Sequence, residues 1–177
     1  MIFENLAIDT NELPKVGELS FERLEKKYLN VSLLAEAIFF LALLTGGICL
    51  IFFNDDITTS LPNFAYMCGG VILLWATTAW ITYKGFFKKM YALRSRDVIY
   101  KKGLIWQSRT SIPFNRVQHA EIKQGPLDRL YSLYSLKIYT AGGQSSDLVI
   151  PGLTEAKAQS LKEFILKKTA ADAPHIN

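Results

Sequence analysis

The side chains best suited to bind a ligand in this sequence are basic and lie in its second half. Seven of them recur between positions 94 and 123: Arg94, Arg96, Lys101, Lys102, Arg109, Arg116 and Lys123. Guanidinium groups can hold phosphate oxygens in a bidentate geometry, and ammonium groups add positive charge. The pattern predicts contacts with anionic phospholipid or with a protein partner.

Two alternatives to specific binding have to be weighed. The first four positions follow an apolar run closely, and positive residues beside a membrane span are expected for orientation alone. Arg109, Arg116 and Lys123 are further from that run, so orientation explains them less well. The same charge could attract nucleic acid. No RNA- or DNA-binding motif accompanies the aromatic residues, which we expect in a protein core, so we expect no nucleic-acid partner.

No pattern typical of an enzyme is present. His119 has no evident nucleophile near it in the sequence, and His175 is close to the end of the chain. The carboxylates of the second half are scattered and lack metal-ligand spacing. The sequence has no P-loop and no Rossmann glycine pattern. We therefore expect no catalytic residues, no metal and no cofactor.

Two apolar runs are each long enough to cross a membrane. Residues 31–53 contain one ionisable side chain, Glu36, and residues 64–83 contain no acid or base. A hydrocarbon core of about 30 Å requires ~20 helical residues. The two runs predict a transmembrane helical hairpin.

The basic residues around this hairpin predict its orientation. The connecting segment, residues 54–63, has no Lys or Arg, whereas basic residues precede the first run and follow the second. Both ends of the hairpin are therefore expected in the cytoplasm. Residues 1–30 form a polar cytoplasmic segment with no pattern of a cleaved signal peptide. Around residues 20–30, an interfacial helix and an extension of the first span are both open.

Glu36 is a functional candidate because carboxylates are costly within a span. It lies near the cytoplasmic end of the first run, so its side chain could reach the interface. Pairing with a basic group of another helix is the alternative. A transport function would require the hairpin to assemble around Glu36.

The pattern changes from helical to strand-like after Lys84. Short alternating segments flank a turn at Gly103, Pro126 begins a short helical turn, and Thr154 can cap a final amphipathic helix. Residues 1–83 carry four Lys/Arg and nine Asp/Glu, a net charge of −5, whereas residues 84–177 carry sixteen and seven, a net charge of +9. Residues 84–170 are predicted to form a basic, mainly-β domain with a C-terminal helix, and residues 171–177 a tail.

The stretch LRSRDVIYKKGLIWQSRTSIPFNRVQHAEIKQGPLDRLYSLYSLKIYTAGG, residues 93–143, resembles bacterial PH-domain membrane proteins of the YdbS type. The matching features are the strand–Gly103–strand hairpin, the step from Ile112-Pro113 into Arg116-Val117-Gln118, the 125–130 segment and the Thr140-Ala141-Gly142 ending. The family commonly has Gly after the short helical segment, where this chain has Tyr131-Ser132-Leu133. The resemblance implies a two-helix membrane hairpin followed by a pleckstrin-homology-like (PH-like) barrel with a C-terminal helix.

What the resemblance implies about function is limited to binding. Proteins of this type are similar to membrane scaffolds, sometimes encoded with a larger paralogue that carries several such domains, and no catalytic residue set comes with them. We therefore hypothesise a non-enzymatic, multi-pass protein of the bacterial inner membrane that docks a protein partner at the cytoplasmic face. Specific recognition of anionic phospholipid is the alternative, and a subunit of a membrane transport or export complex is a third. Homo-oligomerisation is left open.

Overall fold

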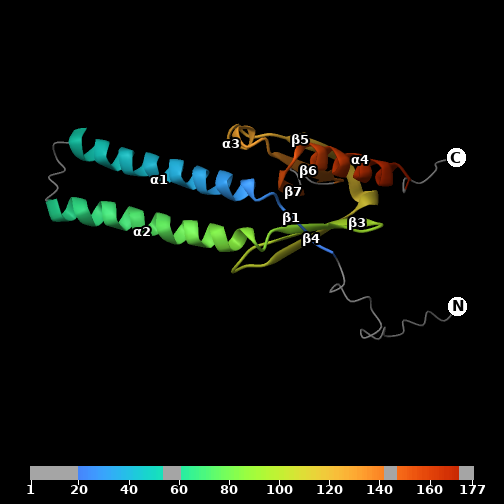
Figure 1. Cartoon of the computed structure of the whole chain (residues 1–177), viewed down its shortest axis with the longest axis horizontal. Coiled ribbons are helices and arrows are strands. Elements are labelled where there is room, and N and C mark those ends of the chain that lie inside the picture. The colour runs from blue at the N-terminus through green and yellow to red at the C-terminus, as the bar shows by residue number, and fades with distance from the viewer. Residues whose placement is uncertain (1–19, 54–60, 142–146, 172–177) are drawn as a thin grey trace, which may run out of the picture.

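The computed structural model describes residues 20–53, 61–141 and 147–171. Two long helices, α1 (Lys27–Phe53) and α2 (Leu61–Phe86), lie side by side and extend away from the rest of the chain (Figure 1). At about 1.5 Å per residue each is about 40 Å long, which exceeds a hydrocarbon core of about 30 Å. Their outward faces expose many large apolar side chains, as expected of helices in lipid. The predicted hairpin is confirmed.

The remaining elements form two antiparallel sheets and a C-terminal helix. The first sheet has the order β1-β2-β3-β4: Glu22–Arg23, Met90–Leu93, Asp97–Lys102 and Ser108–Pro113. The second has the order β5-β6-β7: Val117–Lys123, Tyr134–Thr140 and Leu148–Leu153. Three helical elements complete the fold: η3 (Phe114–Arg116), α3 (Pro126–Leu130) and α4 (Glu155–Ala171). This is the predicted PH-like architecture.

Local chemistry sets several of these boundaries. Gly103 has φ +100°, and a Cβ there would overlap the carbonyl oxygen of Trp106, so the predicted turn between β3 and β4 requires glycine. The backbone N–H of Lys157 donates to Thr154 Oγ1 at 3.3 Å, which confirms the predicted cap of α4. Ser132, just after α3, takes φ +52°. The chain thus makes a left-handed turn here with a serine.

The core lies between the two sheets and the inner face of α4. Its fully buried members include Val98 of β3, Leu136 and Ile138 of β6, and Ile150 of β7. Ala158, Leu161 and Ile165 of α4 cover them, as the apolar stripe of that helix predicts. Burial of these side chains makes the residues after the hairpin a folded domain.

The segment before the first span differs from both alternatives drawn from the sequence. No helix begins at Ser20; instead Glu22 and Arg23 form strand β1, which pairs with Tyr91 and Met90 of β2, and α1 begins at Lys27. Leu24 is buried in the core of the PH-like domain, so folding into the sheet removes it from water. The hairpin is therefore inserted between the first two strands of the domain, which the predicted boundaries of 84–170 left incomplete.

The hairpin and the domain meet at a tight contact between α1 and β7. Gly152 of β7 has φ +64°, and its backbone carbonyl accepts a hydrogen bond from the N–H of Glu25 at 2.9 Å. A Cβ at position 152 would lie 2.6 Å from Cβ and Cγ of Tyr28. Only glycine satisfies both the conformation and the space at this junction.

We therefore expect Gly152→Ala to destabilise the protein by about 1–3 kcal/mol, because the added methyl group both strains the backbone and overpacks the junction. Thermal unfolding of the detergent-solubilised protein measures the change. Gly69→Ala is the matched control, since nothing lies within 4 Å of a Cβ there. Equal melting temperatures for the two variants would contradict the role of this contact.

Candidate functional site

The PH-like domain has two ends, which strand β3 connects. The turn between β3 and β4 lies at the end that faces the hairpin, because Leu104 Cβ is 3.9 Å from the Cβ position of Gly85 in α2. Figure 1 shows this turn pointing in the same direction as the two helices. We call this the proximal end of the domain. The turn between β2 and β3, residues 94–96, lies at the opposite, distal end.

The structure divides the seven predicted basic positions between these two ends. Those at the proximal end lie on β3, β4 and β5: Lys101, Lys102, Arg109 and Lys123. Those at the distal end lie in the β2–β3 turn and in η3: Arg94, Arg96 and Arg116. They therefore do not form one cluster, although Arg94 and Lys102 are only eight positions apart in the sequence.

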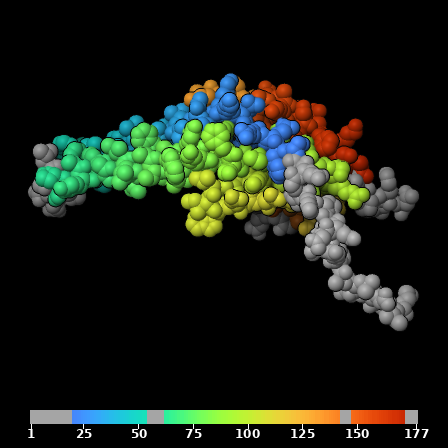
Figure 2. All heavy atoms as spheres, turned by 60° about the horizontal axis from the view of Figure 1, so that its bottom comes forward, coloured from blue at the N-terminus to red at the C-terminus, as the bar shows by residue number. Residues whose placement is uncertain are grey.

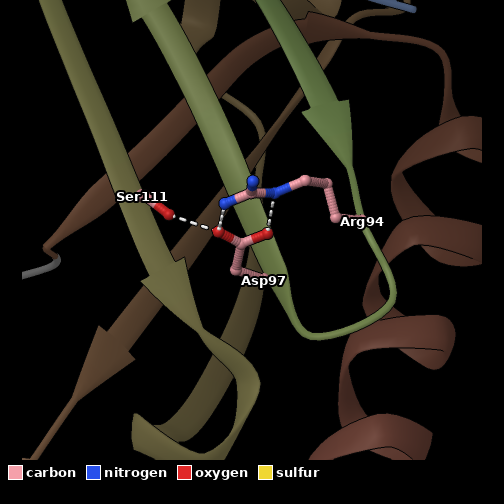
Figure 3. Close-up of polar contacts among 3 residues, drawn as sticks. All are labelled: Arg94, Asp97 and Ser111. Atoms are coloured by element: carbon pink, nitrogen blue, oxygen red, sulfur yellow. Dashed lines mark hydrogen bonds and ion pairs between the residues drawn. The ribbon is translucent and has the colours of Figure 1, made fainter. Parts of the chain in front are cut away.

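The distal end is built around a buried carboxylate (Figure 3). Arg94 Nε donates to Asp97 Oδ1 at 2.5 Å, the guanidinium also donates to Asp97 Oδ2, and Ser111 Oγ of β4 donates to Oδ2 at 2.5 Å. The hydrogen bonds from Arg94 hold the pKa of Asp97 below its usual value, although burial opposes this. Arg94 thus closes the β2–β3 turn and is engaged within the protein.

The other two distal residues have freer side chains. Arg96 and Arg116 are exposed and form no ion pair within the described part of the chain. A shallow cavity of about 350 Å³ lies beside Arg96, but the carboxylate of Asp97 also lines it. This end is consequently less suited to an anionic ligand than its arginines alone suggest.

Several basic side chains lie close together at the proximal end. Lys101 and Arg109 are directly opposite each other on β3 and β4, an arrangement of like charges that destabilises a sheet. The ammonium of Lys89, just past α2, lies 5.2 Å from the ring centroid of Tyr28. Burial lowers the pKa of Lys89, and the nearby charge of Lys102 lowers it further. A negatively charged surface would relieve the repulsion within this group.

Two of the proximal candidates have partners within the chain. Lys123 Nζ is 3.3 Å from Glu121 Oε1, and the guanidinium of Arg109 lies 6.0 Å from the ring centroid of Phe21. Lys101 and Lys102 form no ion pair with any residue in the described ranges. These two lysines are the proximal charges most available to an outside ligand.

Glu36 lies between the two helices of the hairpin. Thr82 of α2 donates its hydroxyl hydrogen to Glu36 Oε1, whereas Thr78, one turn earlier, bonds only to carbonyls of its own helix among the described residues. The partner of Glu36 is therefore a hydroxyl group of the same hairpin, where the sequence left open snorkelling or a basic partner. A hydrogen bond of this kind fixes the pairing of the helices.

The first sheet ends at β4, which leaves one strand edge open among the described residues. Among the described residues β4 pairs only with β3, so the backbone groups along its other side have no strand partner. Most of its side chains are exposed. By contrast, α4 packs against β5 of the second sheet. An open strand edge can accept an extended segment of another protein.

The structure also shows the surroundings of His119, which the sequence analysis considered as a possible catalytic residue. His119 is exposed on β5 beside Tyr139, whose hydroxyl donates to Glu121 at 3.0 Å. The described residues contain no group of three or more His, Cys, Asp or Glu side chains suited to a metal.

For Asp97, we expect the Asn substitution to lower the free energy of unfolding by about 1–3 kcal/mol near neutral pH, because the ion pair with Arg94 is lost. The pKa of Asp97 is lower in the folded than in the unfolded chain, so this contribution is present above about pH 4 and disappears as pH falls through the folded pKa. Unfolding in detergent from pH 3 to 7 measures it. Glu163→Gln on α4 is the control, and a difference independent of pH would refute the assignment.

Comparisons with known proteins agree with this architecture. The profile of the family described as "Bacterial PH domain" matches residues 31–169. The chain is 33% identical over 75 residues to UPF0699 transmembrane protein YdbS of Bacillus subtilis (strain 168), covering 42% of this chain and 45% of YdbS. It is 26% identical over 102 residues to YdbT, a UPF0699 transmembrane protein of the same organism, covering 57% of this chain and 20% of YdbT. The matches thus span less than half of either relative.

One solved structure is also similar. It is a DUF1696 family protein with a pleckstrin-homology domain from Shewanella loihica PV-4, with 18% identity, coverage of 48% of this chain and 73% of that chain, and a TM-score of 0.37. The family match covers most of the sequence, including both helices and both sheets after β1. The chain therefore belongs to the bacterial PH domain family and, within it, resembles the transmembrane proteins of the YdbS type.

Proposed function

We propose that this protein is a non-enzymatic scaffold of the bacterial inner membrane, which docks a protein partner through the open edge of β4. The edge of β4 that no strand of the described residues covers carries the proposal, because its backbone groups can form a ladder with an added strand. The hairpin keeps this edge close to the membrane, since β4 begins directly after the proximal turn. A partner in the same membrane would meet it at high effective concentration.

The side of the membrane follows from charge. Both flanks of the hairpin lie on one side, because β1 before it pairs with β2 after it. The connecting segment, residues 54–63, has no Lys or Arg, whereas Lys and Arg side chains lie close to both ends of the hairpin: Arg23, Lys26 and Lys27 before it and Lys84, Lys88 and Lys89 after it. We infer that the PH-like domain faces the cytoplasm.

We further propose that the partner is a larger membrane protein that carries domains of the same kind. Support comes from the similarity of this chain to two proteins of one organism, of which one is matched over only 20% of its length. Two related domains can pair edge to edge, since each has the strand geometry that the other accepts.

Proline substitutions at two adjacent positions of β4 test the open edge. Neighbouring residues of an antiparallel edge strand point their N–H groups alternately to the paired strand and outward. Of Arg109→Pro and Thr110→Pro, one therefore removes a bond to β3, and the other removes only an outward donor. We expect the variant that removes only the outward donor to keep the melting temperature of the unaltered protein and to lose the partner.

The readout is brief cross-linking of the tagged full-length protein in its own membranes, followed by mass spectrometry of the captured proteins. Arg109→Ala controls for the loss of charge at that position. Undiminished capture by the thermally stable proline variant would show that the partner, if any, binds elsewhere.

A second candidate function is recognition of anionic phospholipid, which the opposed Lys101–Arg109 pair favours. Each basic side chain near an anionic headgroup surface contributes about 1 kcal/mol. We expect Lys101→Glu with Lys102→Glu to abolish enrichment of anionic lipid in the same purification and to leave the β4 partner bound. Arg94 is unsuitable for such reversal, because its loss would open the distal turn. Unchanged lipid enrichment in the double variant would exclude this function for the proximal lysines.

A further inference from the structure

Two loops at the proximal end expose large apolar side chains. Ile105 and Trp106 in the β3–β4 turn are 68% and 86% exposed, and Leu130 at the end of α3 is 72% exposed. Outside the hairpin helices, these are the three most exposed large apolar residues in the described part of the chain. Trp106, expected from the sequence to lie in the core, is the most exposed of them. The adjacent Ile105 and Trp106 form a contiguous exposed apolar surface, which is a candidate contact surface.

The two loops lie beside different helices of the hairpin. The β3–β4 turn lies beside α2, where Leu104 meets the last helical turn at Gly85. Figure 2 shows this turn, in yellow, as a projection next to the green α2. On the other helix, Leu127 of α3 shares a groove of about 490 Å³ with Ala35 of α1. Both loops therefore reach the ends of the helices that enter the membrane.

Basic side chains flank each of these loops. Lys102 and Arg109 lie on the strands that lead into and out of the β3–β4 turn, and Arg129 precedes Leu130. Tryptophan is enriched at the level of lipid headgroups, where its ring meets both apolar and polar surroundings. Lysine and arginine are attracted to the same level when the leaflet is anionic. The two loops thus have the composition of segments that rest in a membrane interface.

We propose that the Ile105–Trp106 turn and Leu130 are two apolar membrane-contact sites that insert into the interfacial layer of the leaflet next to the domain. They would hold the domain in a fixed orientation on the bilayer whether or not β4 has bound a partner. The inference goes beyond the scaffold function, because it assigns lipid contacts to residues that partner docking does not use.

The position of the two membrane-contact sites favours lipid over protein as the partner that they contact. The β3–β4 turn and α3, which carry them, lie beside two different helices and extend to a similar level along the hairpin (Figure 1). A bilayer around the hairpin presents interfacial lipid beside both helices at this level, whereas a protein would have to reach around the hairpin to cover both loops. The tether also holds the domain against that bilayer continuously, so contact costs little additional order.

Tryptophan fluorescence in defined bilayers can test this directly, because the chain has three tryptophans, of which two are in α2. Trp75→Phe with Trp80→Phe leaves Trp106 as the single reporter. In nanodiscs that contain phosphatidylglycerol, we expect a blue-shifted emission, strong quenching by lipids brominated on the upper acyl chain, and protection from aqueous acrylamide. Adding Trp106→Phe and Leu130→Trp moves the single reporter to the second membrane-contact site, where we expect the same result.

Ser95→Trp in the tryptophan-free background is the matched control, since Ser95 is exposed in the distal turn. Its emission should stay red-shifted, with quenching by acrylamide and none by brominated lipid. The proposal is overturned if Trp106 behaves like this control. It is equally overturned if Trp106 is protected from acrylamide but insensitive to brominated lipid, because a second protein chain would then cover it.

The unaltered protein provides an independent readout if the substituted variants fold poorly. Hydroxyl-radical footprinting in the same nanodiscs should leave Trp106 largely unoxidised and oxidise it strongly when phosphatidylglycerol is replaced by a short-chain detergent that leaves the domain folded. Equal oxidation in both settings would overturn the proposal.

Discussion

The pairing of β1 with β2 is the constraint on which the rest of the structure depends. The two strands are adjacent in a sheet, yet both membrane helices lie between them in the sequence. Neighbouring strands are about 4.8 Å apart, so the chain must leave and re-enter the domain at almost the same point. The hairpin therefore cannot swing freely on its flanks. Leu24 in the core and the Glu25–Gly152 hydrogen bond reinforce this attachment.

A rigid attachment gives every surface of the domain a defined distance from the membrane. The six residues of β3 separate the proximal and distal turns by roughly 16 Å, at about 3.3 Å per residue. Charges at the two ends consequently meet different surroundings. The distal Arg94 is used within the protein to neutralise Asp97, whereas the proximal Lys101 and Lys102 lack such a partner in the described residues. Proximity in sequence and proximity to the membrane are thus separate properties in this domain.

The sequence predicts elements whose signal is long or chemically specific, including the two spans, the Gly103 turn and the Thr154 cap. Strand β1 escapes prediction because two residues carry no periodicity and the pairing with β2 spans the whole hairpin. The turn at residues 94–96 has neither Gly nor Pro, although Ser95 and Asp97 are weak turn signals. Without this turn, the sequence gives no sign that the basic residues of the distal end and those of the proximal end are separate groups. Trp106 lies in the turn between β3 and β4, so the expectation that aromatic residues lie in the core fails for it.

The insertion of the hairpin within the sheet also orders the events of biosynthesis. Arg23 pairs with Met90, so 67 residues must be translated after one strand before its partner exists. At roughly 5–20 residues per second this interval lasts roughly 3–13 s, and both helices are synthesised within it. The first strand waits on the side where it was made and can join the sheet only when the second helix has returned the chain to that side. The pairing of β1 with β2 is therefore incompatible with a topology in which only one of the two helices has crossed the membrane.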